Sequence, residues 1–160
     1  NFKSGDLPAV APAVVDWIPG GSHVEITCIA TADLAQRRVV RSEGSMLPAS
    51  SPAVWAGNTL YLSASAGVAD RRLSAETEEQ VHQLGRNQAA VLKEAGLGLE
   101  DIVSGLVYLR HIDDYQAMNG IYKEYFSKGP GVRTTLMPSN RRDNPPIRVS
   151  ASFIAAKTQP

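Results

Sequence analysis

One arginine carries the clearest potential for chemistry in this sequence. Arg133 opens the segment VRTTLMPS, which has the extended pattern of a β-strand. A guanidinium group stays charged and presents a planar pair of N–H donors that matches a carboxylate. The position therefore predicts a binding site for a small carboxylate. An ion pair with an acidic side chain across an interface is the alternative interpretation.

The sequence holds none of the standard catalytic or metal-binding motifs. It has no GxSxG, HExxH or P-loop and no Cys-His zinc spacing. The three histidines, His23, His82 and His111, are scattered, which favours surface or structural roles. The only cysteine, Cys28, lies in the apolar run VEITCIA, which predicts a buried small side chain and excludes an intrachain disulfide. We expect no cofactor and no metal.

Composition predicts one soluble domain. The 160 residues include 16 basic and 16 acidic side chains, so the formal net charge is zero. This balance does not favour a nucleic-acid partner, because the arginines form isolated pairs and not a patch. No apolar run reaches membrane-spanning length and no signal peptide is visible, so we expect a cytoplasmic protein. The chain does not begin with methionine, and we expect its natural N-terminus to differ from residue 1.

Periodicity predicts an α+β domain with the order β-β-α-β-α-β-β. Alternating or continuous apolar residues indicate strands, and a Thr77–Gln80 capping box indicates the start of a long helix. Residues 69–74 are expected to be a polar connection and residues 139–146 a turn-rich loop. The expected strands cover residues 38–42, 58–65, 102–112, 132–137 and 147–155, and the expected helices run from Thr77 to about Ala95 and from a cap at Asp113 or Asp114 to Gly129.

The stretch from Gly57 to Phe126 resembles the Rid family, also called YjgF or L-PSP, of small imine deaminases. The resemblance extends over about residues 39–156 and is best in the helix, Gly turn, strand and helix of EEQVHQLGRNQAAVLKEAGLGLEDIVSGLVYL and its continuation. It implies a Rid or chorismate-mutase-like fold over residues 36–160. This fold has a mixed six-stranded sheet, two helices on one face, and a trimeric or pseudo-trimeric assembly with clefts at the subunit boundaries.

The resemblance also implies a site and an activity. Arg133 would hold the carboxylate of a small imine or enamine, with Ser63 and Asn119 lining the substrate cleft. Thr135 takes a position that is often cysteine in the family, and Ser150 takes that of a glutamate thought to position the attacking water; both are candidate catalytic residues. The family's SGQ is Ser63-Ala64-Ser65 here, and its PYSQA is replaced by residues 51–54. These departures leave two alternatives to a cofactor-independent deaminase: a non-catalytic subunit completing clefts in a hetero-oligomer, and a ligand-binding regulator.

The first 35 residues resemble the C-terminal end of the same chain. Both regions run from an extended segment through a proline and a polar loop to an alternating segment. We expect residues 1–35 to be an N-terminal β segment, the tail of a preceding Rid-like domain, which would pair with a second Rid-like chain carrying the missing part. An unrelated N-terminal extension is the alternative. The matched positions are Pro19 with Pro138, Val24 with Ile147, and Ile26 with Val149.

Overall fold

A mixed β-sheet forms the centre of the domain. The computed structural model describes residues 6–42, 50–127, 131–138 and 146–157. Strand order is β1-β2-β3-β9-β7-β8, with the short β4 also pairing with β9, and every pairing is antiparallel except that of β7 with β8. The expected α+β class with a mixed sheet and two helices is confirmed. The strands are β1 (Arg37–Val40), β2 (Ala53–Ala56), β3 (Thr59–Leu62), β4 (Ser65–Ala66), β7 (Ile102–Leu109), β8 (Val132–Leu136) and β9 (Val149–Ala156).

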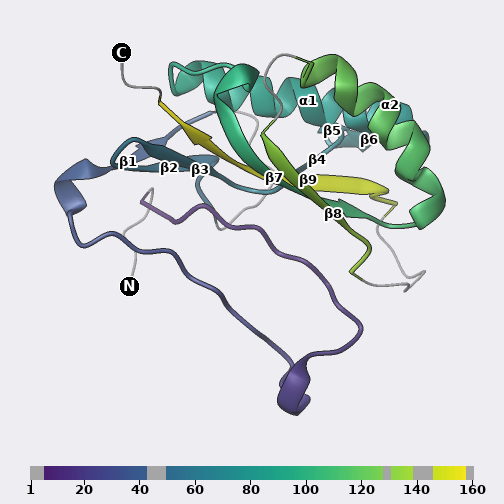
Figure 1. Cartoon of the computed structure of the whole chain (residues 1–160), viewed down its shortest axis with the longest axis horizontal. Helices are drawn as coiled ribbons and strands as arrows, with labels where there is room; N and C mark the ends of the chain where they lie inside the picture. Colours follow the sequence, from purple (N-terminus) through teal and green to yellow (C-terminus); the bar gives the residue numbers. More distant parts are fainter. Residues whose placement is uncertain (1–5, 43–49, 128–130, 139–145, 158–160) are drawn as a thin grey trace.

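Two helices cover one face of the sheet. Helix α1 (Thr77–Glu94) and helix α2 (Tyr115–Tyr125) both lie on that side, and the N-terminal segment lies beyond the opposite face (Figure 1). Short 3₁₀ turns, η3 (Leu99–Asp101) and η4 (Ile112–Asp114), lead into β7 and α2. Because α2 connects two parallel neighbours, β7 and β8, it passes back over the sheet and delivers the chain to the start of β8.

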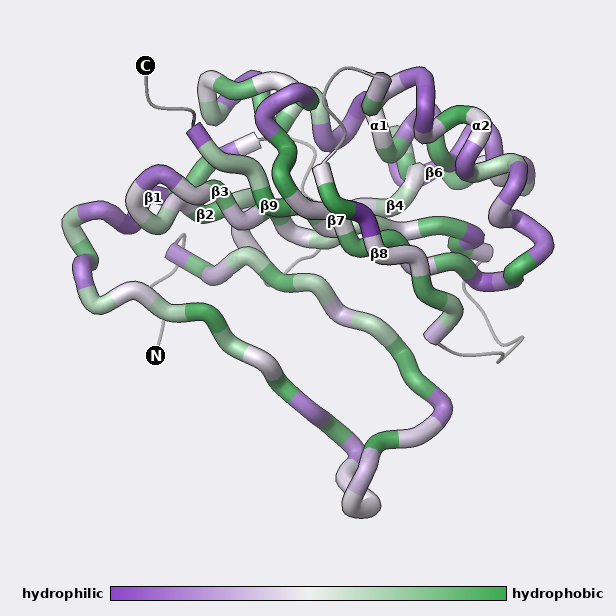
Figure 2. The backbone as a smooth tube through the Cα atoms, in the orientation of Figure 1, coloured by the Kyte–Doolittle hydropathy of each residue, from purple (hydrophilic) through white to green (hydrophobic). Residues whose placement is uncertain are grey.

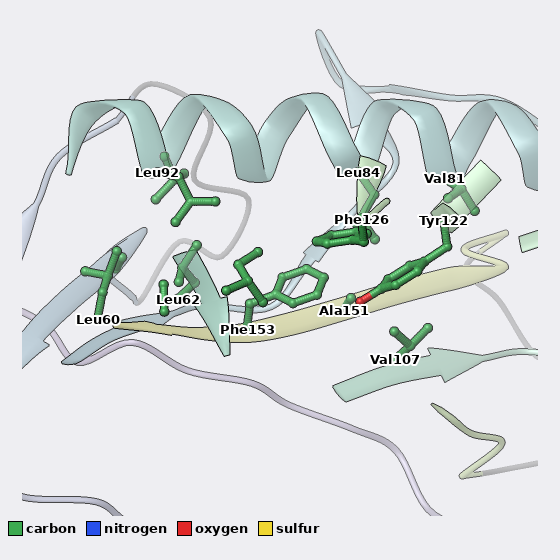
Figure 3. Packing of buried hydrophobic residues seen from close by; sticks show 14 of the residues in the cluster. Leu60, Leu62, Val81, Leu84, Leu92, Val107, Tyr122, Phe126, Ala151 and Phe153 are labelled. Atoms are coloured by element: carbon green, nitrogen blue, oxygen red, sulfur yellow. The ribbon is translucent and has the colours of Figure 1, made fainter. Parts of the chain in front are cut away.

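The core fills the space between the helices and the sheet. Side chains alternate along β9, so Val149, Ala151, Phe153 and Ala155 are each at most 2% exposed while the residues between them are half-buried. Figure 3 shows Leu84 and Leu92 of α1 and Phe126 packed above Phe153. Helix α1 is therefore held by one apolar stripe, as its periodicity predicts.

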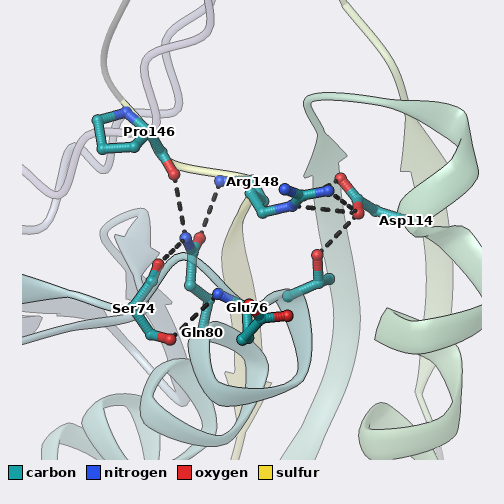
Figure 4. Close-up of polar contacts among 7 residues, drawn as sticks. Ser74, Glu76, Gln80, Asp114, Pro146 and Arg148 are labelled. Carbon is teal, nitrogen blue, oxygen red and sulfur yellow. Dashed lines mark hydrogen bonds and ion pairs between the residues drawn. The ribbon is translucent and has the colours of Figure 1, made fainter.

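A polar cluster fastens the beginning of α1 to α2 and β9 (Figure 4). The buried Asp114 carboxylate accepts hydrogen bonds from the Thr77 hydroxyl at 2.7 Å and from Arg148 Nη2 at 2.8 Å. Burial acts to raise the pKa of Asp114, but the hydrogen bonds from Arg148 and Thr77 outweigh burial and lower the pKa. Gln80 donates to the Ser74 and Pro146 carbonyls and accepts from the Arg148 backbone N–H.

The predicted capping box is therefore wrong. Thr77 lies within the first turn of the helix, after Glu76, and its hydroxyl reaches Asp114. Asp114 does precede α2, but its carboxylate makes no capping hydrogen bond. The Thr77 and Asp114 side chains hydrogen-bond to residues that are far away in the sequence, and a local sequence pattern does not reveal such partners.

Two short strand pairs escaped prediction from the sequence. Strand β2 forms a hairpin with β3 across Gly57, whose φ of 62° suits the turn. The expected polar connection contains a small hairpin of β5 (Val68–Ala69) and β6 (Arg72–Leu73), turned at Asp70 and Arg71 with φ of 49° and 61°. The turn-rich loop expected at residues 139–146 lies outside the described residues, apart from Pro146.

The N-terminal segment is extended, but its described part, residues 6–36, contains no β-strand. It contains only two 3₁₀ turns, η1 (Pro19–Gly21) and η2 (Leu34–Gln36). Its first residues are fixed to the domain, since the Pro8 and Val10 carbonyls accept hydrogen bonds from the Ser51 and Ala64 backbone N–H groups. Cys28 is exposed, so the expectation that it is buried is wrong for this chain by itself.

Among the described residues, no helix combines the length and apolar character needed to cross a membrane.

Candidate functional site

Arg133 is the second residue of β8, the last strand in the order of the sheet. Its Nη2 donates a hydrogen bond of 2.8 Å to Asn119 Oδ1. Asn119 and Tyr122 are three residues apart on α2, so both side chains reach the same side of β8. Among the described residues, no ion pair joins Arg133 to a carboxylate, which makes its guanidinium a candidate for binding an anion.

The ring of Tyr122 packs against the Arg133 guanidinium. The Arg133 Cζ lies 4.5 Å from the centre of the Tyr122 ring, in the geometry of a cation–π contact. Burial raises the pKa of the Tyr122 phenol, and the Arg133 charge partly offsets that rise. Tyr122 in turn stacks on Phe126, with ring centres 4.1 Å apart. The arginine is therefore oriented by a rigid aromatic stack that is part of the core.

Gly105 makes room for this stack. It is in register with Arg133 on one side and with Phe153 on the other. A Cβ at this position would lie 2.8 Å from a Phe153 ring carbon and 3.3 Å from the Tyr122 hydroxyl. The absence of a side chain thus lets both rings lie directly over β7.

Thr135 shares the side of β8 that carries Arg133. The two residues are two positions apart on one strand, so their side chains project to the same face. The Thr135 Oγ1 is buried and has no hydrogen-bond partner among the described residues. A buried hydroxyl without a partner costs about 1–3 kcal/mol, so a ligand or water that bonded to it would recover this energy.

Ser63 lies away from Arg133 within one chain. It follows β3, and β9 and β7 separate that part of the sheet from β8. Three strand spacings correspond to about 14 Å. Its hydroxyl is also occupied, since it donates to the Ser51 carbonyl at 2.6 Å and accepts from the Val10 backbone N–H at 2.9 Å. The expectation that Ser63 lines the Arg133 cleft is not met inside a single chain.

Ser150 faces the opposite side of the sheet. Its neighbours Val149 and Ala151 point into the core, and Ser150 is in register with Tyr108 and Ala66. By contrast, Arg133 is in register with Gly105 and Phe153, on the helix-facing side. One chain therefore brings together Arg133, Asn119 and Thr135, and leaves Ser63 and Ser150 elsewhere.

The arrangement is a half-site for a small anion. It combines the Arg133 guanidinium, the Asn119 amide that accepts its hydrogen bond, the Tyr122 ring and the buried Thr135 hydroxyl. In the described part of the chain, no hydrogen bond or ion pair joins Arg133 or Thr135 to a carboxylate or an imidazole, so the arrangement shows groups for binding but no general base. The site residues expected from the sequence did not include Tyr122, whose ring contacts the Arg133 guanidinium. The spacing of Asn119 and Tyr122 on one helix is the signal that could have linked them.

Comparison with known proteins assigns the chain to a family. The family model for endoribonuclease L-PSP matches residues 45–149. The chain belongs to the Rid/YjgF/L-PSP family. It is 37% identical over 112 residues to a RutC family protein of Saccharolobus solfataricus, a match that spans 68% of this chain and 86% of the relative. It is also 29% identical over 99 residues to a 2-iminobutanoate/2-iminopropanoate deaminase of Dermatophagoides farinae, over 58% of this chain and 77% of the relative.

Solved structures of the Rid family share the fold. RidA from the Antarctic bacterium Psychrobacter sp. PAMC 21119 matches with a TM-score of 0.68 and 22% identity, over 75% of this chain and 100% of RidA. The YjgF gene product of Escherichia coli matches with a TM-score of 0.67 and 20% identity, over 76% of this chain and 99% of YjgF. The N-terminal segment precedes the region that the family model matches.

Proposed function

We propose that this Rid-family chain is a cofactor-independent hydrolase of a small imine or enamine that carries a carboxylate. The observation that carries the proposal is the Arg133 fork, held by Asn119 and Tyr122 and paired with no carboxylate among the described residues. A guanidinium with two parallel N–H groups is suited to a carboxylate. The relative named as a 2-iminobutanoate/2-iminopropanoate deaminase acts on compounds of this class.

The proposed reaction is hydrolytic deamination. Water adds to the imine carbon, the carbon–nitrogen bond of the resulting tetrahedral intermediate breaks, and a 2-oxo acid and ammonia leave. Arg133 would fix the carboxylate, and the Thr135 hydroxyl would hydrogen-bond to the water or to the reacting nitrogen. Fixing both reactants at reacting distance can supply much of the rate enhancement without a cofactor.

We further propose that a neighbouring subunit completes the site. Ser63 and Ser150 lie far from Arg133 or on the other sheet face within one chain, so a cleft containing all of them needs residues from two copies. A homotrimer, or a hetero-oligomer with a second Rid-like chain, would provide this cleft. Among the described residues β8 pairs only with β7, and its Val132 and Leu136 are exposed, which supports such a boundary.

A second candidate is a Rid-fold subunit that binds ligand or completes clefts without catalysis. Two observations favour it. The Ser63 hydroxyl is already used by Ser51 and Val10, and Ser150 is not a carboxylate and cannot act as a base near neutral pH without help. We retain a cytoplasmic location and the absence of a nucleic-acid partner as parts of the proposal, the latter because the formal net charge is zero.

The decisive experiment measures imine hydrolysis directly. An amino-acid oxidase generates 2-iminobutanoate from 2-aminobutanoate in situ, and the decay of the imine is followed with and without the assembled protein. We expect acceleration by the wild type, loss of acceleration in Arg133→Ala, and full activity in Arg86→Ala. Arg86 is an exposed arginine of α1 that hydrogen-bonds to Gln83 and so controls for loss of a charge.

Two results would separate the candidates. If the wild type is inactive but binds 2-oxobutanoate in an Arg133-dependent way, the ligand-binding subunit replaces the hydrolase. If Arg133→Ala binds this probe as tightly as the wild type, the carboxylate site itself is wrong.

A further inference from the structure

The N-terminal segment exposes an apolar surface that its own domain does not cover. It consists of a first arm, residues 11–18, and a second arm, residues 22–32, joined by η1. Its large apolar side chains are exposed, including Trp17 at 74% and Ile26 at 76%. Figure 2 shows these apolar stretches along both arms, away from the sheet. Contiguous apolar exposure of this kind marks an interaction surface.

The sequence identifies what the second arm resembles. Residues 24–32, VEITCIATA, align without a gap to residues 147–155, IRVSASFIA, which contain most of β9. The alignment matches Ile26 with Val149 and Cys28 with Ala151. Val149 is 2% and Ala151 1% exposed inside the core, whereas Ile26 and Cys28 are exposed. The second arm therefore has the side-chain pattern of a central strand without the sheet that would bury it.

The separation of the two arms also fits a match of the first arm with β8 and of the second arm with β9. In the domain, β8 and β9 do not pair with each other, because β7 lies between them. The first arm is followed by Pro19 and matches the β8 segment, which is followed by Pro138. In the N-terminal segment the two arms stand apart (Figure 1), and no backbone hydrogen bond joins them in the described part of the chain. The lack of backbone pairing between the described arms corresponds to the separation of β8 and β9 by β7.

The directions of the side chains at Ile26 and Cys28 also agree with the match between the second arm and β9. A hollow of about 1410 Å³ separates the arms from the outer face of the sheet, and its lining includes Val24, Glu25, Thr27, Ile29 and Ala30 but not Ile26 or Cys28. In β9 the residues matched to Ile26 and Cys28 point to the helices, and Ser150, matched to Thr27, points to the outer face. At the middle of the second arm, Ile26 and Cys28 thus do not line the hollow that faces this domain, whereas Val24 and Ala30 nearer its ends do.

We propose that residues 13–32 supply the last two strands of a preceding Rid-like domain. They insert into the sheet formed by the rest of that domain, which we call its body. The body supplies counterparts of β1 to α2 and lacks its own β8 and β9. Its β7 counterpart enters between the two arms, antiparallel to the second arm and parallel to the first, as β7 pairs with β9 and β8 here. Ile26 and Cys28 then face the helices of that body, and its sheet closes the hollow against Leu106 and Tyr108 of this domain.

Cys28 allows a direct test, because it is the only cysteine of the 160 residues. The natural gene product is purified with whatever it assembles with, and the rate at which N-ethylmaleimide modifies Cys28, followed by mass spectrometry on the peptide that contains it, is compared with that in the 160-residue chain alone. We expect the assembly to slow the reaction by at least about 100-fold, because a thiol inside a sheet reacts only when the structure opens. Intact mass under denaturing conditions then shows whether the body is joined to residue 1 or is a separate, cleaved polypeptide, and its sequence must contain the β1-to-α2 pattern.

Two variants sharpen the test. Ile26→Asp places a charge where the proposed body buries an apolar side chain, and we expect it to restore fast labelling of Cys28 and to release a cleaved body. Ile112→Asp makes the same change at a residue that is 61% exposed near α2, and we expect it to keep the protection. Both sites are exposed in this domain, so neither change should unfold it.

Three outcomes would overturn the proposal. The first is labelling of Cys28 in the native assembly as fast as in the chain alone. The second is protection in an assembly that contains only copies of the 17.1 kDa chain, which would make a second copy the occupant. The third is unchanged protection in Ile26→Asp. None of these outcomes depends on Arg133, so the proposed activity is tested separately.

Discussion

Substitution of Gly105 by alanine tests whether the core stack positions the arginine. The new Cβ would lie 2.8 and 2.9 Å from two ring carbons of Phe153. Ordinary carbon–carbon contacts are about 3.5–4.0 Å, so the ring must move by about 0.7 Å. Phe153 is 2% exposed and stacks against Phe126, so it has little free space into which to move.

The expected magnitude follows from this overpacking. A methyl group forced into a well-packed core costs about 1–3 kcal/mol. The displacement also reaches Tyr122, whose hydroxyl lies 3.3 Å from the new Cβ and whose ring supports Arg133. We therefore expect Gly105→Ala to lower the free energy of unfolding by about 2 kcal/mol and to weaken binding of 2-oxobutanoate by about tenfold.

Gly120 provides the matched control. It lies in α2, is exposed, and an added Cβ there meets nothing within 4 Å. Gly120→Ala should stabilise the protein by about 0.5–1 kcal/mol, since alanine loses less backbone entropy in a helix. Urea unfolding gives the stabilities and calorimetry gives the affinities. If Gly105→Ala unfolds at the same urea concentration as the wild type, or binds the carboxylate equally well, the link between stack and site is refuted.

Three further changes address the arginine, the polar cluster and the last strand. Arg133→Lys keeps the charge but loses the fork, so calorimetry should find 2-oxobutanoate affinity between those of the wild type and Arg133→Ala. Asp114→Asn should lower the free energy of unfolding by about 1–3 kcal/mol at pH 7, because it removes the charged acceptor of Arg148 and Thr77. The pKa of Asp114 is lowered on folding, so its stabilisation is complete above the unfolded value of about 3.9 and is lost as the pH falls through the folded value. Urea titrations at several pH values should therefore show the wild type approaching Asp114→Asn in acid; a constant difference down to pH 2 would contradict this. Ser150→Glu should raise the imine-hydrolysis rate of the assembly by about 100-fold if only a base is missing, and an unchanged rate would show that the carboxylate is not the only defect.

The elements with strong periodicity were predictable from the sequence. Helix α1 was expected from Thr77 to about Ala95 and runs to Glu94, and the strand expected at residues 102–112 is β7, Ile102–Leu109. Strand β2 was missed because its sequence, AVWA, is apolar throughout and shows no alternation, and the β5–β6 hairpin was missed because its turn uses Asp70 and Arg71, not glycine. The Rid assignment made from the middle of the chain is confirmed by the family match.

The sequence by itself determined the order of the elements, the family and the arginine that could bind a carboxylate, because these depend on local pattern and residue type. Only the tertiary structure decided which side chains meet. It placed Asn119 and Tyr122 against Arg133, sent the Thr77 hydroxyl to Asp114, and set Ser150 on the far face of the sheet, since strand register and helix packing fix partners that are far apart in the chain. The structure also leaves Ile26 and Cys28 exposed where their sequence pattern predicts burial, and the proposed insertion into a preceding domain starts from that difference.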